Sequence, residues 1–355
     1  MTETDLATRA PESDAAADAP PATASAGEAG LSEHCLRFSA SGHPPTKGET
    51  RKLGGVDVYV SKPDEYPHAP ARLLLLLTGG TGLRSTNNQI QADMFADNGF
   101  VVVMPDLFGG DVAPNSATTL AGGDGADTSD PHVPLTAGDA GQSSSSFLDL
   151  FKTKAVETVK SFLIDMWLAR HTEAKVLPIL RHVLEASRDE FADAVSSGDG
   201  VYAVGYCFGG RYVLLLAGDN LDGTAAPAPA VAAAGATNTA VVDEDVEATA
   251  GTKPLGPGPW IKAGALAHAT LVSPDDFQGL QAPISMVCVE NDPMFPDAVR
   301  TAGEDYLSKH HVEHEVQVYP GVPHGFAVVG DYAEETIKTA QATAFEQMLS
   351  WLNAH

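Results

Sequence analysis

The sequence predicts a doubly wound α/β domain, in which a mostly parallel sheet carries helices on both faces. Three observations predict it. Short apolar runs of strand length alternate with stretches of helical periodicity, the runs are apolar at almost every position, and glycine-rich turns follow two of them. Strands of this kind are typical of a parallel sheet buried on both faces. Repeated β–α units imply right-handed crossovers, so the loops after the strands share one edge, where ligands bind.

The elements are expected in the following order. The run RLLLLL at 72–77 is the first predicted strand, and the tight loop TGGTG follows it. A helix at 88–98 keeps its apolar residues on one face and stops at Gly99, before the buried strand FVVVM at 100–104. The remaining predicted elements are helices at 147–170 and 174–197, a strand at 201–205, a helix at 208–217, strands at 264–269 and 284–289, a helix at 297–309, a strand at 313–319 and a helix at 331–353.

Three low-complexity stretches accompany this pattern. Residues 1–30 are rich in Ala, Pro and acids and are interpreted as a flexible tail ahead of a single domain at 33–355. Within the domain we expect a long polar loop at about 106–146 and a low-complexity insertion at about 219–260. The tail and the insertion each carry six acids and one base, so together they hold 10 of the 26 excess negative charges.

Charge and composition exclude several classes of protein. The 355-residue chain has 21 Lys and Arg against 47 Asp and Glu, a formal net charge of −26, which repels nucleic acid. The most apolar run, 73–77, is far too short to cross a bilayer, so no membrane span is expected. Three cysteines, no secretory hydrophobic segment and no Arg-rich leader predict a cytoplasmic protein.

The sequence GYCFGG at 205–210 has the form of a nucleophile elbow between a predicted strand and a predicted helix. An elbow forces its central residue, here Cys207, into a strained backbone conformation, and the flanking glycines leave room for the adjoining strand and helix. The N-terminus of the following helix favours a thiolate over a thiol. The alternative interpretation is a buried structural cysteine beside a tight turn.

A cysteine nucleophile needs a base, and the base needs a group that orients it. Downstream of the elbow, Asp292 follows one predicted strand and His324 follows the next. Both belong to the same predicted sheet edge as Cys207, and the order nucleophile, acid, histidine is that of the folds in which this elbow occurs. Glu290 remains a rival acid.

These motifs resemble the dienelactone hydrolase family of the α/β-hydrolase superfamily, with the strongest likeness to its fungal-type branch. The resemblance rests on GYCFGG, ENDPMFP, PHGF and MPDLFGGD, and it spans roughly residues 33–353. It implies an α/β-hydrolase fold and a carboxymethylenebutenolidase-like enzyme that hydrolyses small carboxylic esters or lactones. The implied machinery is a triad of Cys207, Asp292 and His324 with a covalent acyl-thioester intermediate.

Two backbone N–H groups must bind the oxyanion that forms in such a reaction. The residue after the nucleophile, Phe208, is expected to supply one, and Gly80 in the loop after 72–77 is expected to supply the other. No cofactor and no metal is expected. The histidines at 310, 311 and 314 straddle a helix end and a strand start without a cysteine or paired acid to complete a metal site.

Two positions depart from the family's pattern. Gly79 stands where members often carry an acid that gates ionisation of the thiol, and Val328 stands where some carry an Arg that binds a substrate carboxylate. A neutral or larger ester is therefore as consistent with the sequence as a dienelactone. A non-catalytic binding protein and a thiol switch on the same scaffold remain alternatives. The natural substrate, the role of the insertion and the oligomeric state stay open.

Overall fold

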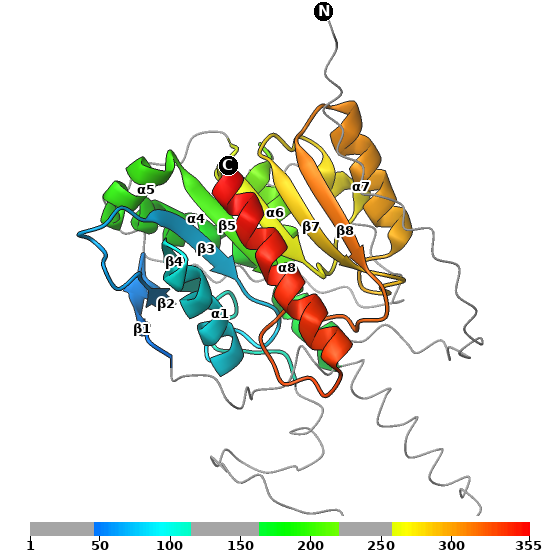
Figure 1. Ribbon diagram of the computed structural model, residues 1–355, viewed down its shortest axis with the longest axis horizontal. Helices are drawn as coiled ribbons and strands as arrows, with labels where there is room; N and C mark the ends of the chain where they lie inside the picture. Colours follow the sequence, from blue (N-terminus) through cyan, green and yellow to red (C-terminus); the bar gives the residue numbers. More distant parts are fainter. Residues whose placement is uncertain (1–45, 115–162, 220–257) are drawn as a thin grey trace, which may run out of the picture.

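The computed structural model describes residues 46–114, 163–219 and 258–355, which fold around one eight-stranded sheet (Figure 1). The strands are β1 (Glu49–Leu53), β2 (Val56–Ser61), β3 (Arg72–Leu77), β4 (Phe100–Pro105), β5 (Val201–Tyr206), β6 (Ala263–Ala267), β7 (Ile284–Val289) and β8 (His314–Tyr319). Their order across the sheet is β1-β2-β4-β3-β5-β6-β7-β8. The pairs formed among β3 to β8 are all parallel. The pairs β1–β2 and β2–β4 are antiparallel. The predicted fold class is confirmed.

Helices cover both faces of the sheet (Figure 1). The described helices are α1 (Thr86–Asp97), α4 (Glu173–Glu190), α5 (Ala192–Gly198), α6 (Phe208–Ala217), α7 (Asp297–Lys309) and α8 (Glu335–Ala354), with a further helical stretch at 163–170 and the 3-10 turn η2 (Pro274–Phe277). Buried side chains of α1 and α8 join one apolar cluster, and those of α4, α6 and α7 join the other. Among the described helices, none is both long and apolar enough to cross a membrane.

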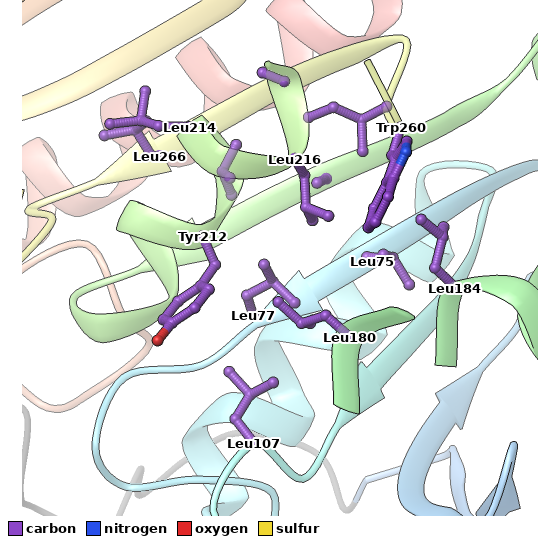
Figure 2. Close-up of a cluster of buried hydrophobic side chains, with 14 of the residues drawn as sticks. Leu75, Leu77, Leu107, Leu180, Leu184, Tyr212, Leu214, Leu216, Trp260 and Leu266 are labelled. Atoms are coloured by element: carbon purple, nitrogen blue, oxygen red, sulfur yellow. The ribbon is translucent and has the colours of Figure 1, made fainter. Parts of the chain in front are cut away.

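The side chains of β3 show why this sheet is apolar throughout. Successive residues of a strand point to opposite faces. Leu73, Leu75 and Leu77 therefore enter the cluster under α4 and α6, whereas Leu74 and Leu76 enter the cluster under α1 and α8. Figure 2 shows part of the first cluster, in which leucines of β3, α4 and α6 lie together. Burial on both faces is what the continuous apolar runs predict.

The structure corrects three details of the predicted elements. The helix expected at 174–197 divides at Phe191, whose dihedrals (φ −112°, ψ 42°) are not helical, into α4 and α5. The strand expected at 264–269 ends at Ala267, because His268 turns into the left-handed region with φ +37°. The β1–β2 hairpin was not predicted, because β1 is mostly exposed and charged and because Asp57 and Ser61 leave β2 only a short apolar run.

Parts of the predicted organisation fall outside the described residues. These are the tail at 1–30, residues 115–146 of the long loop and residues 220–257 of the insertion. Of the helix expected at 147–170, the described part, 163–170, is helical.

The turn between β5 and α6 packs against β3 without space for a side chain. A Cβ added at Gly209 would overlap the carbonyl oxygen of Leu77, which is backbone and cannot move aside. We expect Gly209→Ala to lower the free energy of unfolding by at least about 2 kcal/mol, measured by urea denaturation.

Gly330→Ala is the matched control, because a Cβ there meets no atom closer than 3.7 Å. This variant should unfold with the wild type. Equal midpoints for the two variants would contradict the close packing of Gly209 on β3.

Candidate active site

Cys207 lies in a strained turn between β5 and α6. Its dihedrals are φ +51° and ψ −117°, and its side chain is buried. A non-glycine residue in this region costs about 1–3 kcal/mol and persists only where its surroundings hold it. The glycines on either side are sterically required, since a Cβ at Gly205 would lie 2.5 Å from the carbonyl oxygen of Gly209. The predicted elbow geometry is therefore present.

Hydrogen bonds from two elements hold this turn. The N–H of Cys207 donates to the carbonyl oxygen of Ala267 at the end of β6 (3.1 Å). The carbonyl oxygen of Cys207 accepts from the N–H of Gly210 (3.0 Å) and from that of Thr270 (3.1 Å). The backbone groups of the strained residue are thus fixed by its own helix and by the loop after β6.

His324 and Asp292 form a buried pair at the same edge of the sheet. Nδ1 of His324 lies 2.7 Å from Oδ2 of Asp292, and the two side chains are 5% and 1% exposed. Oδ1 of Asp292 accepts a second hydrogen bond, from the N–H of Met294 (2.9 Å). The rival acid Glu290 is exposed, so Asp292 is the acid that the structure pairs with His324. This pairing commits Nδ1 to the carboxylate and leaves Nε2 for another partner.

The charges around His324 favour its protonated form. Burial opposes the charge, but hydrogen bonds to Asp292 and Cys207, together with the negative charge of both groups, raise the pKa of His324 to about 9. Nε2 is buried, and the described residues offer it no hydrogen-bond partner of good geometry. The cysteine that raises this pKa is Cys207, the residue in the strained turn.

The loop after β3 contacts the thiol directly. A Cβ added at Gly79 would lie 3.0 Å from Cβ and 3.6 Å from Sγ of Cys207. The next residue, Gly80, is held by its carbonyl oxygen, which accepts from the N–H of Ala113 (2.8 Å). Among the turn and loop hydrogen bonds of the described part of the chain, none is donated by the N–H of Gly80 or by that of Phe208. Both donors are thus available for a ligand.

Two other groups near this part of the fold, Arg211 and Cys288, are bound by carboxylates or uncharged. The guanidinium of Arg211 binds Asp276 at 2.8–3.1 Å and Glu173 at 2.7 Å, so it is held inside the fold by two carboxylates. Burial raises the pKa of the Cys288 thiol to about 12, so this thiol stays protonated. Groups of three or more His, Cys, Asp or Glu that could hold a metal do not occur in the described ranges.

One buried histidine was missed. His268 follows β6 at the carboxyl edge of the sheet and contacts the ring of His324, with 5.0 Å between ring centroids. The available signal was its place directly after an apolar strand, but GALAHA contains no motif that separates it from the other histidines of the chain.

A doubly wound sheet with an elbow cysteine and a buried His–Asp pair at its carboxyl edge defines an α/β-hydrolase. The particular family follows from the sequence profile of the dienelactone hydrolase family, which matches residues 56–355. The chain belongs to this family, as its motifs predict, and is therefore a hydrolase of that family.

Relatives and solved structures agree with this assignment. The chain is 27% identical to Hydrolase pyvD of Aspergillus violaceofuscus over 87% of this chain and 91% of that protein. It is 26% identical to Hydrolase tropI of Talaromyces stipitatus over 90% and 93% of the two chains. A crystal structure of a candidate dienelactone hydrolase from Klebsiella pneumoniae has the same fold, with TM-score 0.53, 15% identity and coverage of 87% of this chain and 99% of that chain.

The raised pKa of His324 makes stability depend on pH. Because this pKa lies above the value of about 6.5 in the unfolded chain, the bound proton stabilises the fold fully below pH about 6.5. This contribution disappears as the pH rises through about 9. We expect the stability advantage of the wild type over Asp292→Asn to shrink by up to about 3 kcal/mol across this window. Urea denaturation at a series of pH values measures it, and a constant or growing advantage would contradict the assignment.

Proposed function

We propose that the protein hydrolyses small carboxylic esters or lactones, with Cys207 as nucleophile, His324 as base and acid, and Asp292 as the group that orients His324. One observation carries the proposal: a buried carboxylate–imidazole pair whose free side interacts with a cysteine in a strained elbow. A structural cysteine requires neither the left-handed backbone nor the charged pair beside it.

Acylation begins with the thiolate of Cys207, whose proton resides on Nε2 of His324. The sulfur attacks the carbonyl carbon, and the carbonyl oxygen becomes an oxyanion bound by the N–H groups of Phe208 and Gly80. Each such donor contributes about 2.7–4 kcal/mol to lowering a barrier of this type. The oxyanion then collapses, the bond to the leaving oxygen breaks, and His324 donates its proton to that oxygen. An acyl thioester and a free alcohol group result.

Deacylation repeats these steps with water. Neutral His324 takes a proton from a water molecule as its oxygen attacks the thioester carbon. The second tetrahedral intermediate expels the Cys207 thiolate and releases a carboxylic acid, while His324 keeps the proton. Asp292 holds the Nδ1–H tautomer throughout and stabilises the imidazolium. The resting thiolate–imidazolium pair is thereby restored.

Neutral substrates fit this site better than anionic ones. Val328, at the position where some relatives have an Arg, packs against an apolar cluster, and Arg211 is already bound to Asp276 and Glu173. The net charge of −26 opposes the approach of an anion. Gly79, which lies beside the Cys207 thiol, has no carboxylate that could control ionisation of this thiol. We therefore infer an uncharged ester or lactone as the substrate class, in the reducing cytoplasm that suits a free thiol nucleophile.

The names of the curated relatives support this proposal. Two are hydrolases, and a third, from Gibberella moniliformis, is Dienlactone hydrolase 1, which is 23% identical over 90% of this chain and 92% of that protein.

Replacement of the thiol tests the proposal. We expect Cys207→Ala to lose at least about 10³-fold in kcat on p-nitrophenyl acetate and on a dienelactone, because no other group can form the acyl intermediate. Release of p-nitrophenolate and the decay of dienelactone absorbance measure the two rates. Unchanged turnover by this variant would reject the nucleophile.

Cys288→Ala is the matched control. Cys288 is also a buried cysteine and lies within the parallel strand β7, but its thiol stays protonated and plays no part in the proposed chemistry. This variant should keep the wild-type rate. A loss of turnover in Cys288→Ala equal to that in Cys207→Ala would show that the assay reports damage to the fold.

A further inference from the structure

The end of β6 and the loop that follows it contact two members of the proposed triad, Cys207 and His324. Its residues 267–270 bind both backbone groups of Cys207, through the carbonyl oxygen of Ala267 and the N–H of Thr270 (3.1 Å each). Between these two contacts, the loop inserts the ring of His268 against the ring of His324. The two ring centroids are 5.0 Å apart and the ring planes are inclined by 65°. One short segment therefore fixes the nucleophile and touches its base.

His268 is held in an unfavourable state. It is fully buried, and its backbone has φ +37° although it is not glycine. Neither ring nitrogen has a hydrogen-bond partner among the described residues, which is costly for a buried polar side chain. Strain and unpaired polar groups that persist in a fold gather at functional sites.

The surroundings of His268 keep its ring fixed and uncharged. The backbone N–H of His268 donates to the carbonyl oxygen of Val287 (2.8 Å). The ring centroids of Tyr206 and Phe326 lie 6.0 and 6.2 Å from that of His268. Burial, and then the positive charge of His324, lower the pKa of His268 well below its usual value. His268 therefore does not compete for the proton of His324.

The neutral ring of His268 meets the ring of His324 in an edge-to-face arrangement. Since the ring nitrogens of His268 have no hydrogen-bond partner among the described residues, its influence on His324 comes from the shape and the aromatic character of the ring. Edge-to-face contacts between rings at such distances are favourable. The titratable groups that face His324 are Asp292, Cys207 and His268, with Tyr206 behind His268. Asp292 bonds to Nδ1 of this ring, Cys207 raises its pKa, and His268 contacts the ring from the side.

We propose that His268 is a positioning residue, whose aromatic face sets the tilt of the His324 imidazole so that Nε2 stays directed at Cys207. The proposal rests on the proposed function of the triad. A displacement of about 1 Å in such a site costs up to about 10²-fold in rate, so support of this kind is consequential for turnover.

A pair of substitutions separates aromatic support from the filling of space. His268→Leu occupies the site without an aromatic face, whereas His268→Phe restores the face, and both bear the same left-handed backbone. We expect His268→Leu to lower kcat by about tenfold or more with little change in KM. Its alkaline limit in the pH profile of kcat/KM should move to lower pH. His268→Phe should recover both properties to within about threefold and unfold at no lower urea concentration than the wild type.

Control variants at a second stacked histidine complete the experiment. His310 is exposed and stacks on Tyr306 at the end of α7 (4.1 Å between centroids), so His310→Leu and His310→Phe should match the wild type. If His268→Phe is as impaired as His268→Leu, or if His268→Leu keeps the wild-type rate and pH profile, the proposal is wrong. If His268→Leu does not fold, His268→Met replaces it with the same expectations.

The same series distinguishes failure of this proposal from failure of the proposed function. Loss of turnover in Cys207→Ala establishes the nucleophile independently of His268. Full turnover in Cys207→Ala would overturn the proposed function. In that case the titration of His324, followed by NMR in the His268 variants, still tests the positioning: a pKa of His324 that falls in His268→Leu and returns in His268→Phe supports it, and an unchanged pKa overturns it.

Discussion

The left-handed backbone of Cys207 is the constraint on which the rest of the site depends. That conformation turns the chain sharply from β5 into α6 and sets the thiol at the carboxyl edge of the sheet. It is stable only because the neighbouring glycines allow strand and helix to approach, and because the ends of β3 and β6 supply hydrogen bonds and close contacts. The apolar side chains on both faces of the sheet thus fix the strands whose ends surround Cys207.

The charge favoured on His324 at this edge of the sheet is opposite in sign to the net charge of the chain. The chain carries a net charge of −26, yet the buried imidazole of His324 favours its cationic form. Burial alone would remove that charge. The nearby carboxylate of Asp292 and the interaction with Cys207 outweigh burial because they act over short distances where water is excluded. A second histidine, His268, lies against the same ring, and burial without an acidic partner lowers its pKa, so two imidazoles in contact favour different charge states.

Most of the fold was predictable, because a strand buried on both faces has a continuous apolar run as its sequence. The helix at 208–217 and the strand at 284–289 have the predicted bounds. The β1–β2 hairpin was missed because its partly exposed strands carry charged residues, and the division of the helix at Phe191 has no local sequence signal. Cys207 could be found from its glycines, and Asp292 and His324 from chain order. His268 could not, since what distinguishes it is its contact with His324, which is distant in sequence, and ring nitrogens that lack a partner among the described residues.

Titration of His324 by nitrogen-15 NMR of the histidine side chains tests the proposed Cys207–His324 pair most directly. In the wild type we expect this imidazole to remain doubly protonated until the pH approaches about 9, and we expect its pKa to fall in Cys207→Ala, where the sulfur is absent. An imidazole that titrates near pH 6.5, with the same midpoint in both proteins, would contradict the pairing of the thiol with its base.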